Sequence, residues 1–329
     1  MPATILDPRA GWPCVSIGSY IFDILGRPVD SLPKGQTTQL IDEIKVTVAG
    51  SAGGTAVNMS RLGMTVSAVG VVGEDTAGDF VLRKLHEEGV LTGSMRRTSQ
   101  VQTAASILPI DSSGQRPAYH VIGANRLLEL SDVPEQALRS SDIVHVGGMT
   151  ALPGLDGEPM AELLSDAGRW GAFRTLDCLG IKRDDALDLA TIVLPHVDAF
   201  FPNDAEAMRL TGEPDPFRAA QRLVALGAGC VYVTCGERGA IVATAAGIET
   251  VPAFSATPVD STGCGDAFVS GVMLGMLRGE SPVEAARVGA AAAALTVAGL
   301  GSDAGELSPE KVDAYRTSAA ELAYELQPA

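Results

Sequence analysis

Apolar runs alternate with amphipathic stretches along most of the chain, and this alternation predicts a fold class. A short apolar run at 15–17 ends in Gly-Ser, as expected of a buried strand. Helical periodicity over 55–62 and 76–88 ends each time at a glycine, and an apolar run at 66–72 separates the two stretches. From residue 142 onward, expected strands and helices alternate, which is typical of a mostly parallel sheet covered on both faces. The later strands are expected at 143–146, 174–177, 199–201 and 230–234, and the later helices at 159–170, 184–194, 205–210, 217–226 and 283–297.

Two stretches break this pattern. Between 20 and 48, prolines and a glycine interrupt short alternating segments. Further along, 103–109 and 117–122 flank a turn-forming Asp-Ser-Ser-Gly segment, as in a hairpin. Both stretches predict short strands in a small sheet that stands apart from the main one.

Composition and charge narrow the class of protein. The 329 residues, 46% of them hydrophobic, can bury one large core or a core with a smaller appendage. Forty acidic against 24 basic residues give a formal charge of −16, which argues against nucleic acid and against an anionic membrane as partners. Five cysteines without a Cys-x-x-Cys pair indicate neither a disulfide framework nor a zinc site. The sequence has no signal-like start and no apolar run of membrane-spanning length, so we expect a cytoplasmic protein.

Residues 259–268 combine glycines with a carboxylate at the expected start of a helix. The Gly-x-Gly turn at 263–265 precedes an apolar run, so free backbone N–H groups lie where the helix dipole favours a phosphate. Asp266 follows on the first turn, where a carboxylate can take a proton from a hydroxyl that attacks a bound phosphoryl group. The segment therefore suggests a kinase. Alone, it is equally typical of a loop that ends in a helix cap.

The sequence lacks the commonest nucleotide-binding loops. None of the five lysines follows a glycine, which excludes a Gly-Lys-Ser/Thr P-loop. Glycines at 299, 301 and 305 resemble a dinucleotide fingerprint, but they follow an alanine-rich helical stretch where the fingerprint requires a strand. A dinucleotide-dependent oxidoreductase is therefore disfavoured, and the glycines at 263–265 are the best-placed anion site.

Several motifs together resemble those of the ribokinase-like, or phosphofructokinase-B type, carbohydrate kinases. Residues 260–268 read Asp-Ser-Thr-Gly-Cys-Gly-Asp-Ala-Phe, similar to the family's C-terminal Asp-Thr-Thr-Gly-Ala-Gly-Asp signature. The Gly-Gly-Thr-Ala-Val-Asn segment at 53–58, continued at 69–75, resembles its N-terminal signature. Between them, 203–206 is similar to an Asn-x-x-Glu motif and 233–239 to a Val-Thr-x-Gly-x-x-Gly nucleotide loop. The resemblance covers nearly the whole chain.

The resemblance implies an ATP- and Mg²⁺-dependent kinase that phosphorylates a hydroxymethyl group of a small sugar or sugar acid. Asp266 would be the base. The implied anion hole consists of the amides of Gly263, Cys264 and Gly265. The residues implied to position ATP, or to act on the metal through water, are Asn203, Glu206, Thr234, Gly236 and Gly239. The residues implied to hold the acceptor are Asp23, Gly53, Gly54 and Asn58.

The resemblance also implies an architecture. We expect a single ribokinase-like kinase domain, in which a mostly parallel central sheet is flanked by helices. A small β-sheet lid, from about 20–48 and 102–122, would be inserted in this α/β core. Because a lid of strands has an exposed face and an edge, a homodimer formed through the lid is expected.

A site for a monovalent cation such as K⁺ is implied behind the anion loop. Asp260 and Thr262 match the family's pattern for this site. The carbonyls that would complete the site are those of Thr296, Gly299 and Gly301. An ion there would fix the neighbouring amides in their anion-binding geometry, which is an electrostatic role.

Each motif also has a purely structural interpretation. Asn203 and Glu206 can be a helix cap and its third-residue partner. The glycines at 236 and 239 can form a hairpin turn, and those at 53 and 54 a tight turn from strand to helix. Asp23 can be a solvated loop acid. The joint occurrence of these motifs, in the family's order, favours the catalytic interpretation.

Departures from the family pattern leave the substrate open. Ala290 stands where many relatives have an asparagine near the adenine, so adenine recognition must rely on shape or on other groups. The strand end at 145–149 lacks the carboxylate with which ribokinases hold the sugar, which disfavours ribose. Three arginines near the expected lid keep a phosphorylated sugar open as the acceptor: Arg27, Arg116 and Arg126.

Two alternatives remain open at this point. A nucleoside kinase of the same fold would need an apolar wall for the base, which Tyr20 and Phe22 beside Asp23 can supply. A binding protein that kept the fold and lost catalysis is disfavoured by the intact Asp266 and glycine loop.

Overall fold

The computed structural model describes residues 11–180, 183–323 and 326. Its strands are β1 (Pro13–Gly18), β2 (Ile21–Arg27), β3 (Glu43–Ala49), β4 (Thr65–Gly73), β5 (Leu91–Thr98), β6 (Ala105–Pro109), β7 (Tyr119–Val121), β8 (Ile143–Met149), β9 (Phe173–Cys178), β10 (Ala199–Phe200), β11 (Cys230–Thr234), β12 (Ala240–Thr244) and β13 (Gly247–Val251). Its α-helices are α1 (Gly53–Arg61), α2 (Thr76–Glu87), α3 (Glu135–Ser140), α4 (Glu158–Arg169), α5 (Ala186–Val193), α6 (Asp204–Thr211), α7 (Pro216–Ala225), α8 (Cys264–Leu277), α9 (Pro282–Val297) and α10 (Pro309–Ser318).

The larger of the two sheets is mostly parallel, as expected from the alternation of strands and helices. Its nine strands follow the order β13-β12-β11-β10-β9-β8-β1-β4-β5. Every neighbouring pair from β11 to β5 is parallel. The strands β12 and β13 join antiparallel at one edge. The carboxyl ends of the parallel strands therefore point to the same edge of the sheet.

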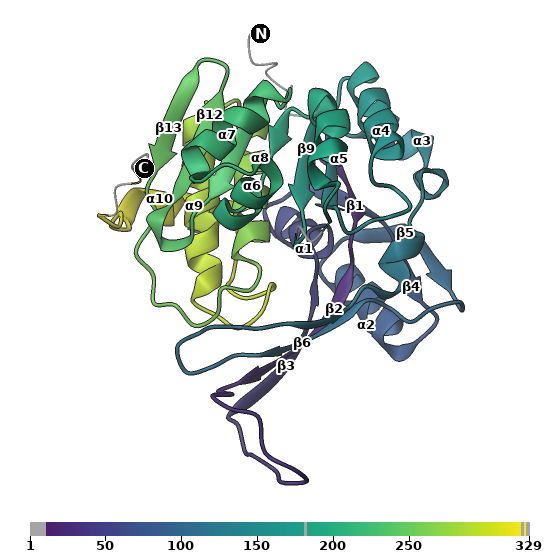
Figure 1. Ribbon diagram of the computed structural model, residues 1–329, viewed down its shortest axis with the longest axis vertical. Coiled ribbons are helices and arrows are strands. Elements are labelled where there is room, and N and C mark those ends of the chain that lie inside the picture. Colours follow the sequence, from purple (N-terminus) through teal and green to yellow (C-terminus); the bar gives the residue numbers. More distant parts are fainter. Residues whose placement is uncertain (1–10, 181–182, 324–325, 327–329) are drawn as a thin grey trace.

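Helices cover both faces of this sheet and form two buried clusters (Figure 1). The helices α1, α2, α8, α9 and α10 pack on one face, and α3 to α7 pack on the other. Side chains of β1 alternate between the two clusters, with Cys14 in the first and Val15 and Ile17 in the second. This alternation explains the continuous apolar runs, because a strand buried on both faces needs apolar residues at every position. None of the helices in the described ranges has the length and apolar character of a membrane span.

Helix starts lie where the sequence places capping residues. Asp75 caps α2 by accepting a hydrogen bond from the amide of Gly78, and Asp215 caps α7 through the amides of Phe217 and Arg218. A cap satisfies backbone N–H groups that lack a partner within the helix. The expected helix at 76–88 is thus confirmed to within one residue.

A second sheet of four strands forms the lid, in the order β3-β2-β6-β7. The pairs β3–β2 and β6–β7 are antiparallel, which confirms the expected hairpin, whereas β2 and β6 pair in parallel. The lid strands extend from one end of the core, below it in Figure 1. One face of the lid leaves large apolar side chains exposed: Ile44, Val46, Ile107, Tyr119 and Val121.

Three strands of the main sheet were not expected from the sequence. The edge strand β5 is rich in polar residues and only partly buried. The strands β12 and β13 form a hairpin that closes the opposite edge. The edge strands β5 and β13 are partly exposed, which weakens their apolar signal, whereas β12 is apolar and buried.

Candidate active site

A cavity of about 640 Å³ lies between the lid and the carboxyl ends of the main-sheet strands. Its lid side includes Asp23 of β2, Ser106 of β6 and Arg116 and His120 from the segment before and within β7. The opposite side is formed by residues at or just after the ends of β8 to β11 and by the start of α8. Open parallel sheets typically bind ligands at this edge.

The N-terminus of α8 forms the expected glycine turn. Gly263 has a φ of +79°, and a β-carbon there would lie 2.3 Å from the Cα of Ser302, so only glycine fits. Gly263 and Gly265 both line the cavity. The amide of Cys264 donates a long hydrogen bond of 3.3 Å to the carbonyl of Ser261. Burial raises the pKa of the Cys264 thiol to about 12, so the thiol stays neutral and does not repel an anion.

Asp266 lies in the cavity wall on the first turn of α8. Burial raises the pKa of its carboxyl to about 7, while the Arg116 guanidinium lowers this pKa and the Asp23 carboxylate raises it further. A base with a pKa near 7 is well matched to proton transfer at neutral pH. The carboxylate packs directly on Gly54 of α1, where a β-carbon would lie 2.1 Å from Oδ2 of Asp266.

The lid contributes one cation and one buried acid to the cavity. Arg116 donates from Nε to the hydroxyl of Ser261 at 3.2 Å, beside the glycine turn. Asp23 is only 5% exposed, so it is not a solvated loop acid. Its Oδ1 atom has no hydrogen-bond partner among the described residues, and burial raises its pKa to about 6. Ser106 and His120 pair beside it, with 3.1 Å between Oγ and Nδ1.

Asn203 and Glu206 form a capping box at the start of α6 and also line the cavity. The Asn203 side chain accepts from the amide of Glu206 at 2.8 Å, and Oε2 of Glu206 accepts from the amide of Asn203 at 3.0 Å. The capping interpretation and the cavity position are thus both correct. Oε1 of Glu206 accepts a further bond from the amide of Gly180 at 3.1 Å.

Asp177, at the end of β9, is a cavity residue that the sequence analysis did not select. Burial holds its pKa well above the ordinary range, and the negative charges of Glu206 and Asp266 raise it further. Its place at the carboxyl end of a predicted strand was the signal that could have identified it. No group of three or more His, Cys, Asp and Glu side chains suited to a metal is found within the described ranges.

The nucleotide loop expected at 233–239 connects two antiparallel strands. Thr234 ends β11, lines the cavity and forms a bridge with Asn203. Gly236 and Gly239 lie in the turn to β12, as the hairpin interpretation had it. A β-carbon at Gly239 would lie 2.1 Å from the carbonyl oxygen of Val251, so this turn requires glycine.

The expected acceptor residues of α1 lie behind the cavity wall. Gly53, Gly54 and Asn58 are buried, and both amide atoms of Asn58 lack a partner among the described residues. The two aromatic residues considered as a wall for a nucleoside base face the core instead. Tyr20 is fully buried and donates to the carbonyl of Ser16 at 2.8 Å, and Phe22 packs edge-on against Phe80.

The residues expected around a monovalent cation lie together and bond to one another. Oδ1 of Asp260 accepts from the amide and the hydroxyl of Thr262, at 2.9 and 2.7 Å. Oδ2 of Asp260 accepts from the amide of Gly301 at 2.8 Å. The carbonyl of Thr296 accepts from the amide of Gly299 at 3.1 Å. Asp260 therefore links the glycine turn to the loop after α9.

A half-buried carboxylate beside a helix N-terminus, with further acidic side chains in the same cavity, suits phosphoryl transfer. The class of protein that this fold and cavity define is a kinase. A family model described as pfkB family carbohydrate kinase matches residues 13–308. The chain belongs to this family and is a phosphotransferase of the sugar and nucleoside kinases.

Relatives within the family differ in what they phosphorylate. A deoxyribokinase from Salmonella typhi is 27% identical over 307 residues, which cover 91% of this chain and 97% of the relative. A nucleoside kinase from Methanothermobacter thermautotrophicus is 26% identical over 311 residues, which cover 94% of this chain and 97% of the relative. A crystal structure of a putative ribokinase II from E. coli, in complex with ATP and Mg²⁺, shares the fold with a TM-score of 0.78 and 20% identity, covering 92% of this chain and 98% of that one.

Proposed function

We propose that this protein is an ATP-dependent kinase that phosphorylates a hydroxymethyl group of a small sugar or sugar acid. The observation that carries the proposal is the placement of Asp266. Its half-buried carboxylate lies on the first turn of α8, beside the glycines at 263–265, and in the same cavity as the polar lid residues Asp23, Ser106 and His120. The proposed base, anion site and hydroxyl-binding wall thus share one cavity.

Asp266 takes the proton of the acceptor hydroxyl while the hydroxyl oxygen attacks the γ-phosphorus of ATP. The bond between the γ-phosphorus and the β,γ-bridging oxygen breaks, and ADP leaves with that oxygen. The transferred phosphoryl group spreads negative charge over its oxygens, and the amides at the start of α8 lie where such charge is stabilised. Arg116, which bonds to Ser261 beside the same turn, adds a positive charge near the transferred phosphoryl group.

The residues on the side of the cavity formed by β9 to β11 fit a Mg²⁺–ATP complex. The negative charge of Glu206 disfavours the charged form of Asp177, and a divalent cation near them would relieve this repulsion. Mg²⁺ usually keeps several waters and takes only one or two carboxylates, in agreement with a pair of acids. When bound, the metal would neutralise charge on the phosphates. Asn203 and Thr234 would then face the nucleotide.

The acceptor wall favours a polyol. Oδ1 of Asp23 has no partner among the residues that the structure describes, and Ser106 and His120 offer groups that both donate and accept. A nucleoside remains the second candidate, because Ile21, Leu108 and Ile122 add apolar surface to the same wall.

A screen of ADP release across ketoses, aldoses, sugar acids and nucleosides tests the proposal. We expect Mg²⁺-dependent ADP release with at least one member of the sugar or sugar-acid set. The Asp266→Asn variant should fold normally and lose activity by about 10³-fold or more, because it removes the base. Retained activity in this variant would refute the assigned mechanism, and activity with nucleosides alone would favour the second candidate.

We also propose that the lid forms a homodimer. Its exposed face carries Ile44, Val46, Ile107, Tyr119 and Val121, whose exposed fractions range from 39% to 69%. Contiguous apolar side chains of this kind mark interaction surfaces. Light scattering at micromolar concentration should show a dimer in the parent and a monomer in the Ile107→Lys variant. A monomeric parent would contradict the proposal.

A further inference from the structure

The loop at 298–305, after α9, lies between the lid and the glycine turn. On the lid side, the hydroxyl of Ser302 donates to the carbonyl of Val48 in β3 at 2.6 Å. On the other side, the amide of Gly301 donates to Asp260 at 2.8 Å, and the Cα of Ser302 is packed so closely on Gly263 that no side chain fits there. The position of this loop therefore sets the position of the anion-binding turn.

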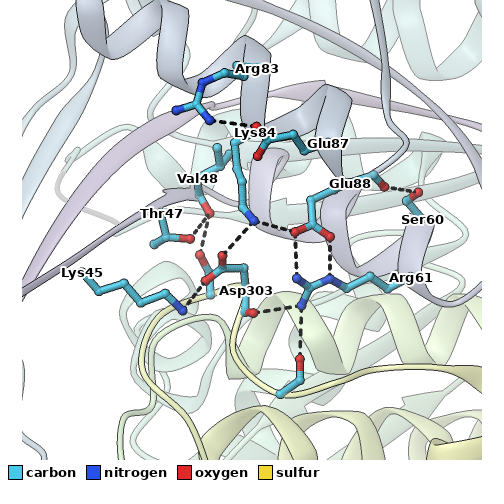
Figure 2. Close-up of polar contacts among 12 residues, drawn as sticks. Lys45, Thr47, Val48, Ser60, Arg61, Arg83, Lys84, Glu87, Glu88 and Asp303 are labelled. Carbon is cyan, nitrogen blue, oxygen red and sulfur yellow. Dashed lines mark hydrogen bonds and ion pairs between the residues drawn. The ribbon is translucent and has the colours of Figure 1, made fainter.

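Two basic side chains hold this loop by its backbone carbonyls, and Figure 2 shows the bond from one of them, Arg61, to Asp303. Lys45 of the lid strand β3 donates from Nζ to the carbonyl of Leu300 at 2.6 Å. Arg61 of α1 donates from Nη1 to the carbonyls of Asp303 and Gly305, at 2.9 and 3.3 Å. The carbonyl of Leu300, which lies between Gly299 and Gly301, thus binds the Lys45 ammonium, and the carbonyls of Asp303 and Gly305 bind the Arg61 guanidinium.

Lys45 also completes a charge pair inside the loop. Its Nζ lies 2.7 Å from Oδ1 of Asp303, whose side chain is only 9% exposed. Although burial alone would raise the pKa of Asp303, its contacts with Lys45, Thr47 and Lys84 hold this pKa below the ordinary value. Lys84 is the more distant partner at 3.5 Å and is itself paired with Glu88 at 2.7 Å. Lys45 therefore supplies the positive charge that lies closest to both the Leu300 carbonyl and Asp303.

We propose that the Lys45 ammonium is the resident cation of this loop, and that it holds the anion-binding turn in place of a monovalent metal ion. An ammonium group is a compact point charge that can bind carbonyl and carboxylate oxygens together. Lys45 is a positioning residue, since it acts on the turn through Leu300, Asp303 and Asp260. The enzyme then needs no K⁺, although its sequence carries the residues implied for a K⁺ site. The effect on catalysis rests on the proposed kinase function, whereas the effect on stability does not.

Thermal unfolding of the full chain tests the proposal without an assay of activity. The melting temperature of the parent should be the same in potassium chloride and in tetramethylammonium chloride at equal ionic strength. The Lys45→Met variant should melt at a lower temperature and recover in potassium chloride only, because an ion that binds only the folded state stabilises it. The matched control is Lys84→Met, which removes the distant partner of Asp303 and should show no difference between the two salts.

Turnover supplies the second readout, once an acceptor is known. The parent should have equal kcat in the two salts, and Lys45→Met should lose on the order of 10-fold in kcat and regain most of it with K⁺ or ammonium. A parent that is stabilised or activated by K⁺ relative to tetramethylammonium would overturn the proposal, and this comparison needs no variant. A Lys45→Met protein that folds but is indifferent to K⁺ in both assays would also overturn it. Failure to find any acceptor would count against the kinase function and leave the melting result to decide the role of Lys45.

Discussion

Replacing Gly54 with alanine is the sharpest perturbation of the catalytic geometry, because Asp266 rests on this glycine. The new β-carbon would lie 2.1 Å from Oδ2 and 2.8 Å from Cγ of the Asp266 side chain. Ordinary contacts between carbon and oxygen are about 3.3 Å, so the carboxylate must retreat by about 1.2 Å. A displacement of about 1 Å in a reacting group can cost about 10²-fold in rate, and we expect a loss of this size in kcat.

Stability should change far less than activity in Gly54→Ala. Overpacking of a buried site costs about 1–3 kcal/mol, and alanine returns up to about 1 kcal/mol through its helix propensity. The atoms in the way belong to the short Asp266 side chain rather than to backbone, so the net cost should fall at the low end. The variant should therefore melt within a few degrees of the parent.

The assay compares kcat and KM for ATP with the melting temperature of the same preparation. The matched control is Gly93→Ala in β5, where the added methyl group meets nothing within 4 Å. Gly93→Ala should keep both its activity and its stability. A Gly54→Ala protein that is folded and has the kcat of the parent would refute the assignment of Asp266 as a base whose position matters.

Further predictions concern the residues around this base. In the parent, kcat/KM should fall as pH drops below about 7, because burial raises the pKa of Asp266 to about 7 and only the ionised carboxylate accepts a proton; a flat pH profile would contradict this. Arg116→Gln should lower kcat and move the acid limb of the profile to higher pH, since the guanidinium lowers this pKa. Gly265→Ala should melt like the parent, because the space at its β-carbon is open, and yet raise KM for ATP by extending into the cavity. Asn203→Ala should cost about 1 kcal/mol in urea unfolding through its lost cap. Glu206→Gln keeps an acceptor for the cap, and a Mg²⁺ titration should show a higher requirement for half-maximal activity.

Local signals in the sequence predicted most of the fold. The helix α2 has a capping Asp75, a regular apolar period and a terminal glycine, and its observed bounds differ by one residue from those expected. The hairpin of β6 and β7 was predicted from its turn residues. By contrast, β5 carries polar and arginine residues and becomes a strand through its pairing with β4, which is distant in sequence. Long-range pairing of this kind leaves little trace in local periodicity.

The residues of the candidate site likewise fall into two groups: those that a local motif predicted and those that only the fold brings together. Asp266 and the glycine turn were identified from a contiguous motif, and Asn203 and Glu206 from their spacing. Arg116 stood out only as one of three arginines, and the structure brings it alone of these into the cavity wall. Asp177 was missed because its place in the cavity depends on which strands lie next to β9, and the sequence does not show this order. The sequence thus predicted what neighbours in the chain bring together, whereas the three-dimensional fold was needed for the rest.

Because the cavity is divided between lid and core, we expect the choice of acceptor to depend mainly on the lid. Every lid residue in the wall precedes residue 123, whereas the base, the anion turn and the acids facing them follow residue 176. A chimera that takes its lid strands from a relative with another acceptor would therefore inherit a new acceptor surface and keep the transfer chemistry, provided that Arg116 is retained in the graft. The grafted lid must fit the loop after α9, because this loop bonds both to the lid strand β3 and to Asp260 beside the anion turn.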